Sequence, residues 1–375
     1  MDITELNKIL KYIEENIRVT DQTTIEYLDP RGHVERLDSK QNQVIFGRRG
    51  SGKSLLLKSI KEKNNSAICL KANLEDFKDI SFPDSIIQIL RALLKQLKVE
   101  IANKHSIWSF YKWRKGKKIS TELNKIINTL TNRLQNPDDY DEAIKSKRGS
   151  KTSSKAELKH KSASASATSE ETEELEVSKS IKIDKLNILK NELPDFKDLI
   201  NRASDFLEKP LFLILDDYYF IRRTDQPYLI DFFHRLSKNT NLYLKVATIK
   251  HRSSLYLQGD TYIGIEMNHD AQPLNLDYSL ENFDALLAFT KDLMNHVKEK
   301  ANSTLDVSEL LTENAFKFLC LASGGVPRDF FSLFIRLGNK IIDGTRSVSK
   351  PDVIEIAIEN LPNKLEAFKT DVSIR

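Results

Sequence analysis

The stretch VIFGRRGSGKSLLL, residues 44–57, most constrains what this chain can fold into. Its Gly47, Gly52, Lys53 and Ser54 fill the fixed positions of G-x-x-x-x-G-K-[ST], the phosphate-binding loop. An apolar run precedes the loop, as expected of a buried parallel strand, and the leucines after it suit a helix that packs on a sheet. A glycine turn that contains Lys-Ser by chance is the alternative. The strand and the helix on the correct sides favour the phosphate loop.

A loop of this kind holds a nucleoside triphosphate. Its glycines let successive backbone N–H groups converge on phosphate oxygens at the positive end of a helix dipole. Lys53 is expected to reach the β- and γ-phosphates, and the Ser54 hydroxyl is expected to bind Mg²⁺. The residues expected to contact the nucleotide are Gly47, Arg48, Arg49, Gly50, Ser51, Gly52, Lys53, Ser54 and Leu55.

A second apolar run, residues 211–215, ends in two acidic residues, Asp216 and Asp217. The carboxyl ends of parallel strands face the ligand in phosphate-loop folds. We therefore expect Asp216 beside Mg²⁺, acting through water, and Asp217 as the general base that polarises the attacking water. A strand capped by two acids at a turn is the alternative, and the phosphate loop favours the catalytic interpretation.

Two more polar positions belong to this prediction. Thr248 lies near the end of an expected strand at 242–249, where a polar group can respond to the γ-phosphate. In SGGVPRDFF the glycines stop one helix and the proline suits the first turn of the next. Arg328 then lies in that first turn, where the helix dipole disfavours a cation unless an anion such as a phosphate is near. An ion pair between Arg328 and Asp329 is the alternative.

The hydrophobic pattern divides the chain into three parts. We expect an N-terminal part at 1–24, an αβα nucleotide-binding domain at 25–278 and a helical lid at 279–375. The N-terminal part holds an amphipathic helix over about 3–17, expected to pack outside the nucleotide core. The other expected helices are 83–99, 195–208, 228–236, 279–300, 313–322, 328–342 and 350–360, and the other expected strand is 67–72.

Two segments differ from the rest. Residues 146–180 are rich in Ser and Ala, nearly free of large apolar side chains, and change from basic to acidic, so we expect a disordered insertion. Residues 108–118, WSFYKWRKGKK, mix aromatic and basic side chains that could stack bases and neutralise phosphates. We favour instead an edge segment with buried rings and a solvated basic fringe, because aromatic side chains usually serve cores.

Composition sets the remaining bounds. The net charge of +4 permits a nucleic-acid partner without arguing for one. The two cysteines, Cys69 and Cys320, lie in apolar stretches with no partner spacing, which predicts buried thiols in a reducing compartment. No apolar run approaches about 18 residues, and the N-terminus is a charged amphipathic helix. We expect a cytoplasmic protein with no membrane contact.

The set GRRGSGKS, LILDD, VATIKHR and SGGVPRD, in this order and with a helical region last, resembles the AAA+ ATPases. It is most similar to the branch of the origin-recognition initiators and their bacterial relatives, over about residues 25–345 without the insertion. The resemblance implies an α/β fold, a P-loop NTPase parallel sheet sandwiched by helices with a C-terminal all-helical lid. It also implies ATP and Mg²⁺ as cofactors. The catalytic residues are then Lys53, Asp216, Asp217, Thr248 (sensor 1) and Arg328 (sensor 2), with Ser54 and Asp216 on the metal.

The sequence departs from that branch in two respects. In that branch the second acidic residue after the strand is usually glutamate. This sequence has the shorter Asp217 there, which favours slow, switch-like turnover. The initiators also carry a DNA-binding winged-helix domain, for which the residues after the lid helices are too few. Signalling ATPases of the STAND type often carry two aspartates and a GxP lid turn, so they are the alternative relatives. The candidates for an arginine finger are Arg222, Arg223, Arg235 and Arg252.

Three functions follow from these patterns. The first is an AAA+ ATPase whose nucleotide-dependent change of shape acts on a protein or DNA partner, in bacterial DNA transactions or antiphage defence. The second is a STAND-like, nucleotide-gated scaffold with little turnover. The third is a nucleic-acid-binding protein that uses residues 108–118. The expected partners are ATP, further copies of the chain, and DNA or protein.

Overall fold

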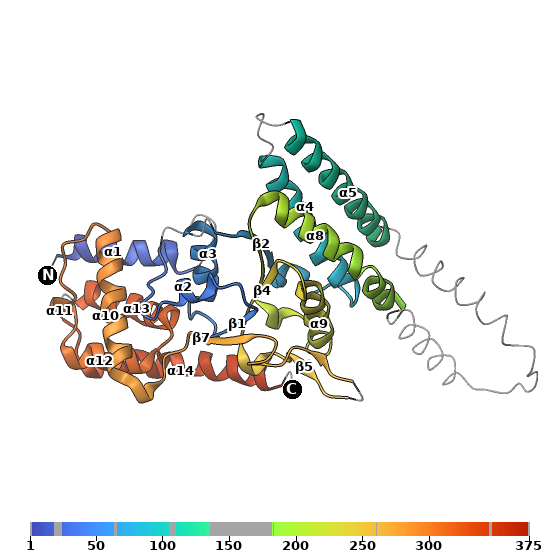
Figure 1. Cartoon of the computed structure of the whole chain (residues 1–375). Helices are drawn as coiled ribbons and strands as arrows, with labels where there is room; N and C mark the ends of the chain where they lie inside the picture. The colour runs from blue at the N-terminus through green and yellow to red at the C-terminus, as the bar shows by residue number, and fades with distance from the viewer. Residues whose placement is uncertain are drawn as a thin grey trace, which may run out of the picture.

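In the computed structural model, an α/β layer lies beside a group of helices formed by the two ends of the chain (Figure 1). The predicted insertion at 146–180 lies outside the described residues. The structure describes residues 2–18, 25–63, 66–104, 110–135, 182, 184–259, 261–344 and 347–373.

A five-stranded, fully parallel sheet is the centre of the α/β layer, in the order β2-β3-β4-β1-β7. Strand β4 separates the loop strand β1 from the acidic strand β3, so three carboxyl ends meet at one edge. Phe46 is paired with Thr248, and Asn73 is paired with Asp216. The strands are β1 Gln43–Phe46, β2 Ile68–Asn73, β3 Leu211–Asp216, β4 Leu242–Thr248 and β7 Gln272–Asn275.

Helices cover both faces of the sheet, because alternate strand residues point to opposite sides. Ile45 packs with α2 (His33–Leu37) and α3 (Lys53–Lys63). Val44 packs in the larger core on the other face. That core contains buried residues of α4 Asp84–Asn103, α5 Phe110–Gln135, α8 Leu193–Leu207 and α9 Gln226–Ser237. The predicted α/β sandwich with a parallel sheet is confirmed.

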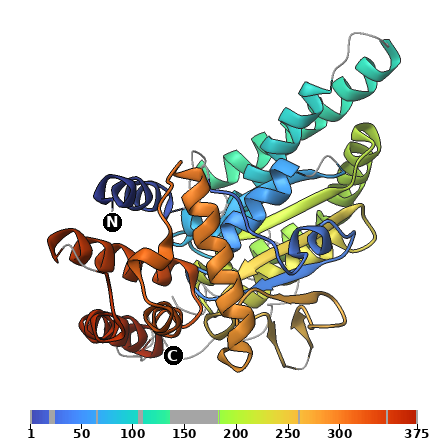
Figure 2. The same cartoon turned by 90° about the vertical axis from the view of Figure 1, so that its left-hand side faces the viewer.

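Helices α4 and α5 extend beyond the sheet on the side away from the C-terminal helices (Figures 1 and 2). The predicted edge segment at 108–118 is a helix from Phe110 onward, and the prediction of a buried ring is wrong for Trp113, of which 43% is exposed. The side chains of Trp108, Phe110 and Tyr111 lie outside the described residues. The buried stripe of α5 contains Ile119, Leu123, Ile127 and Leu130 at helical spacing, and Trp113 lies outside it.

The C-terminal helices and α1 (Ile3–Asn16) share a second hydrophobic core, and we call them the helical cluster. Leu10 of α1 packs so closely on Gly338 that a Cβ there would come within 2.7 Å of its Cδ2 atom. The predicted end of the last helix near residue 360 is wrong, because the helix continues through Pro362. The C-terminal helices of the cluster are α10 Phe283–Lys300, α12 Glu313–Ala322, α13 Pro327–Gly344 and α14 Lys350–Ser373.

Three smaller findings complete the fold. A short antiparallel hairpin, β5 (Tyr256–Leu257) and β6 (Ile263–Gly264), follows β4. Cys69 and Cys320 are both free thiols, although only Cys320 is fully buried. In the described part of the chain, every helix is too short or too polar to cross a membrane.

Candidate functional site

The phosphate loop connects the end of β1 to the first residue of α3. Gly50 and Gly52 have φ angles of 87° and 93°, in the left-handed region that glycine enters at little cost. Gly50 has a second constraint, because a Cβ there would come within 2.6 Å of the Arg328 Cβ. The additional glycine of the loop therefore permits direct contact with α13.

Lys53 lies between the loop and the acidic residues, with only 6% of its surface exposed. Its Nζ donates hydrogen bonds to the carbonyl oxygens of Gly47 (2.8 Å) and Arg48 (3.1 Å). Burial lowers the pKa of Lys53, and the charges of the two aspartates oppose that shift. Its ammonium therefore lies where the loop and the acids meet. Ser54 follows it in the first turn of α3 and is partly exposed.

Asp216 is the last residue of β3 and is 3% exposed. Its Oδ1 accepts a hydrogen bond from the N–H of Asp217 at 3.0 Å, and its Oδ2 lies 3.2 Å from the Nζ of Lys71. Asp217 has a left-handed backbone, with φ 53°. Burial, and then the neighbouring Asp216, raise the pKa of Asp217 to about 6, while Lys53 lowers it.

Thr248 ends β4 and is fully buried, between the loop strand and the acidic strand. Its carbonyl oxygen accepts the N–H of Gly47 at 3.2 Å, and its hydroxyl shares a short hydrogen bond with Ser253. Of the arginine-finger candidates, Arg252 lies 5.6 Å from the centre of the Tyr219 ring. Arg235 forms an ion pair with Asp231 on α9.

Arg328 approaches the loop from the first turn of α13. Its backbone N–H points to the carbonyl of Gly50 at 3.4 Å. Within the described residues its Nε atom is buried without a hydrogen-bond partner. Burial, and then the charge of Arg49, lower the pKa of Arg328. Asp329, the alternative partner in the sequence, forms an ion pair with Lys364. An anion between Arg49 and Arg328 would relieve the repulsion between them.

Arg48 joins the loop to two other segments. Its backbone N–H donates to Asp277 Oδ1 at 2.9 Å, and its guanidinium lies 3.4 Å from the same oxygen. The guanidinium also donates to the carbonyl of Gly324 at 2.6 Å, in the turn between α12 and α13. Sequence reasoning missed Asp277, because it lies more than 200 residues away along the chain and in no motif.

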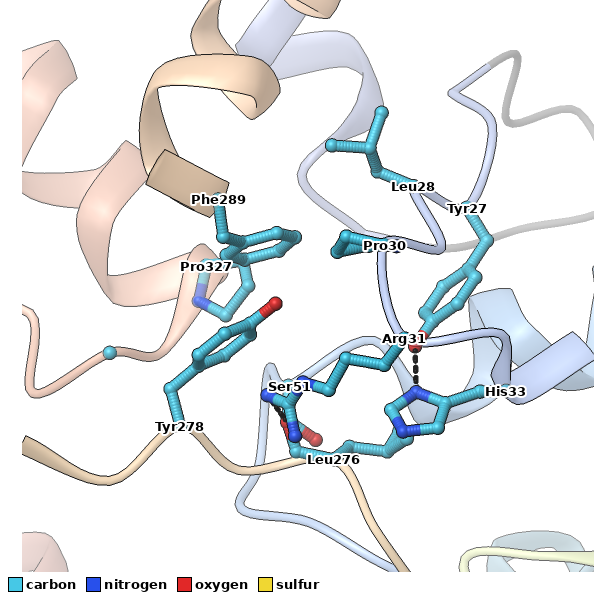
Figure 3. Close-up of a pocket in the computed structure, with 11 residues that line it drawn as sticks. Tyr27, Leu28, Pro30, Arg31, His33, Ser51, Leu276, Tyr278, Phe289 and Pro327 are labelled. Carbon is cyan, nitrogen blue, oxygen red and sulfur yellow. Dashed lines mark hydrogen bonds between the residues drawn. The ribbon is translucent and has the colours of Figure 1, made fainter. Parts of the chain in front are cut away.

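A small aromatic pocket of about 20 Å³ adjoins the loop (Figure 3). Tyr278 stacks on Phe289 with ring centres 4.7 Å apart, and the Arg31 guanidinium lies 3.6 Å from the Tyr278 ring centre. Arg31 is anchored by the carbonyl oxygens of residues 275–277. Ser51 borders the pocket, and its buried Oγ has no hydrogen-bond partner among the described residues. The pocket also contains Tyr27, Leu28, Pro30, His33, Leu276, Gly325 and Pro327.

The residues present fit a magnesium nucleotide. The unpartnered Ser51 Oγ and Arg328 Nε both lie beside the loop, where a phosphate or sugar would supply acceptors. No group of three His, Cys, Asp or Glu side chains in the described ranges could hold a metal ion. A Mg²⁺ ion at Ser54 and Asp216 would therefore need phosphate oxygens as further ligands.

Comparison with known proteins adds little beyond this geometry. No protein-family model and no curated protein sequence matches the chain. Among solved structures the chain is similar to a Walker-type ATPase of Pyrococcus abyssi at 9% identity, with 98% of this chain and 74% of that chain covered and a TM-score of 0.41. The sheet and the loop of this chain themselves define the class, an α/β phosphate-loop nucleotide-binding fold.

Proposed function

We propose that the protein binds ATP with Mg²⁺ and hydrolyses it, and that the bound nucleotide changes how the helical cluster sits on the sheet. One observation carries the proposal: five chemically suitable side chains from separate segments converge beside the phosphate loop. They are Lys53, Asp216, Asp217, Thr248 and Arg328.

Each residue has a role that suits its position. The backbone N–H groups of residues 47–54 and the Lys53 ammonium would hold the phosphates, and Ser54 and Asp216 would hold Mg²⁺. The metal supplies charge that stabilises the phosphate oxygens during transfer. Asp217 would take the proton of the attacking water, and Thr248 would orient that water. The aromatic side chains beside the loop could stack on a nucleobase if they moved apart to admit it.

Two arginines could transmit the difference between a bound triphosphate and a bound diphosphate to the helical cluster. Arg48 contacts the turn between α12 and α13, and Arg328 begins α13 against Gly50. A γ-phosphate between the loop and Arg328 would change the balance of charges at this junction. This arrangement, with the order of the motifs, supports assignment to the AAA+ ATPases of the initiator-like branch and a role in bacterial DNA transactions or antiphage defence.

Steady-state hydrolysis of ATP by the wild type, Lys53→Ala and Asp217→Asn tests the activity. We expect both variants to lose about a hundredfold or more of kcat/KM. Asp217→Asn should still bind nucleotide. Lys61→Ala, an exposed lysine on the same helix as Lys53, is the matched control and should turn over like the wild type. A wild type that is no faster than Lys53→Ala would contradict the proposed hydrolysis.

The alternative is a STAND-like scaffold that assembles when ATP binds and turns over little. The short side chain of Asp217, fixed in a left-handed turn, is the observation that favours it. Light scattering of the wild type with and without Mg·ATP distinguishes the two. Growth in mass with negligible hydrolysis would favour the scaffold, and hydrolysis without a change in mass would contradict it.

Nucleic acid is the partner that charge favours. Helix α5 contains seven Lys or Arg residues and one Glu, a net charge of +6, whereas the whole chain carries +4. Lys117 lies 4.9 Å from the centre of the exposed Trp113 ring, so that a base could stack beside a phosphate-binding cation. The other exposed cations of this segment are Lys112, Arg114, Lys115 and Lys118.

Binding to single- and double-stranded DNA over a series of salt concentrations tests this surface. Replacing the five cations of residues 112–118 with alanine should weaken binding and flatten its salt dependence. A variant with exposed lysines of the helical cluster replaced, Lys291→Ala with Lys300→Ala, is the control. Equal affinities for the five-alanine variant and the wild type would exclude this surface as the contact.

A further inference from the structure

The carboxylate of Asp216 already has a cationic partner, Lys71. The two residues lie on neighbouring parallel strands, with Lys71 Nζ 3.2 Å from Asp216 Oδ2. The other oxygen of the carboxylate accepts the N–H of Asp217. The carboxylate side chain is only 4% exposed, whereas the lysine side chain is 33% exposed. One oxygen of the expected metal ligand is therefore in contact with an ammonium group that water can reach.

The backbone of Lys71 is fixed from the other side by Gln96 of α4. The Gln96 side chain accepts the N–H of Lys71 at 2.9 Å and donates to its carbonyl at 2.7 Å. Strand β2 is at the edge of the sheet, and the side-chain amide of Gln96 forms the pair of hydrogen bonds with it that a neighbouring strand would form. The main chain of Lys71 is therefore held in place, while its four-carbon side chain is free to rotate toward solvent.

We propose that Lys71 competes with Mg²⁺ for Asp216, an inference that rests on the proposed role of Asp216 at the metal. In the absence of the metal, the Lys71 ammonium supplies the counter-charge of a buried carboxylate and holds it in place. A Mg²⁺ ion bound with the nucleotide would supply a second positive charge to the same carboxylate, and Lys71 would turn away into solvent. Lys71 thus sets the Mg²⁺ concentration at which the nucleotide binds tightly.

A Mg²⁺ titration of nucleotide affinity tests the competition. The probe is a fluorescent ATP analogue, bound to wild type and Lys71→Met at increasing Mg²⁺. We expect Lys71→Met to reach half-maximal binding at roughly tenfold lower Mg²⁺, because one repelling charge is gone. Lys71→Arg retains the charge and should resemble the wild type, as should Lys95→Met, an exposed lysine of α4. An unchanged or higher Mg²⁺ requirement in Lys71→Met would overturn the proposal.

Thermal unfolding gives a second reading that does not depend on hydrolysis. In EDTA, Lys71→Met should melt at a lower temperature than the wild type, because its Asp216 lacks a counter-charge. Mg²⁺ with nucleotide should close that gap. A gap of equal size in both conditions would mean that Lys71 serves the fold alone, which overturns the competition.

The same titration separates this inference from the proposed function. A wild type that binds the ATP analogue, with the same Mg²⁺ dependence as Lys71→Met, contradicts only the role of Lys71. A wild type that binds no nucleotide at any Mg²⁺ concentration contradicts the proposed function, and with it the reason for placing Mg²⁺ at Asp216.

Discussion

Asp217 combines a short side chain with a left-handed backbone directly after a buried strand. We expect Asp217→Glu to bring the carboxylate closer to the attacking water and to raise kcat by about tenfold, with little change in KM. Glutamate tolerates this backbone region less well than aspartate, so a small loss of stability should accompany the gain. Steady-state kinetics and thermal unfolding of both proteins provide the comparison. A kcat at or below that of the wild type would show that side-chain length does not limit turnover.

Lys245 is a buried cation in the middle of β4, and its ammonium lies beside the segment that leads into β1. It is 0% exposed, and its Nζ donates to the carbonyls of Ser39 and Gln41 and to the Gln43 side chain. Burial lowers the pKa of Lys245 to about 7. The unfolded chain, with an ordinary lysine pKa of about 10.4, therefore binds more protons between those values. Stability should rise with pH across this window.

The pH dependence of the free energy of unfolding is compared with that of Lys245→Met, a variant with no titratable group at this position. Between pH 7 and about 9.5, the free energy of unfolding of the wild type should increase by about 1–3 kcal/mol relative to the variant. Urea unfolding at several pH values measures both proteins. A difference that stays constant with pH would mean that the ammonium keeps its ordinary pKa in the fold.

At the scale of elements, α1 is attached to α13 by the contact of Leu10 with Gly338. Gly338→Val should destabilise the protein by about 1–3 kcal/mol, because the added side chain needs space that Leu10 fills. A double-mutant cycle with the smaller change Gly338→Ala tests whether the two residues share this space. Because Leu10→Ala opens the space, Gly338→Ala should lower the free energy of unfolding less in the Leu10→Ala background than in the wild type. Denaturant unfolding of the wild type, the two single variants and the double variant measures the coupling. Additive costs would mean that the two residues do not share the space.

Sequence patterns predicted strands β1 to β4 and most of the longer helices, because helical periods and apolar runs are local properties, but they did not predict helix α5. They did not predict β7, whose sequence QPLN is polar and contains proline, and three of its four residues are exposed. Pairing with β1 makes this segment a strand, and that pairing is a tertiary contact. Trp113 was predicted to be buried and is not, because the described stripe of buried apolar side chains on α5 passes through Ile119, Leu123, Ile127 and Leu130 instead.

The candidate site also contains residues that the sequence predicted and residues that it did not. The loop, the acid pair, Thr248 and Arg328 were named from motif spacing, and the structure brings them near one another. The pocket residues and Lys71 have no motif, because they come from separated segments that only the fold brings together. Their roles remain predictions that the variants above can test.

For the whole molecule, the phosphate loop joins the sheet to the helical cluster, because Gly47 is hydrogen-bonded to Thr248 and Gly50 packs on Arg328. Arg48 crosses this junction to reach Gly324 and Asp277. We expect Mg·ATP to raise the melting temperature of the wild type, and Arg48→Ala to lose about half of that shift or more, since one contact between the loop and the helical cluster is gone. Differential scanning fluorimetry measures the shift. Arg336→Ala, at an exposed position of α13, is the control. Equal shifts in Arg48→Ala and the wild type would contradict the bridge.

The contact between Gly50 and Arg328 limits how this protein can be recombined with others. The loop backbone and the first turn of α13 fit against each other with no space for a side chain at position 50. A chimera that grafts the helical cluster of one phosphate-loop protein onto the sheet of another would therefore have to carry a matching loop. The two halves of this molecule are not interchangeable modules, and their boundary runs through the phosphate loop.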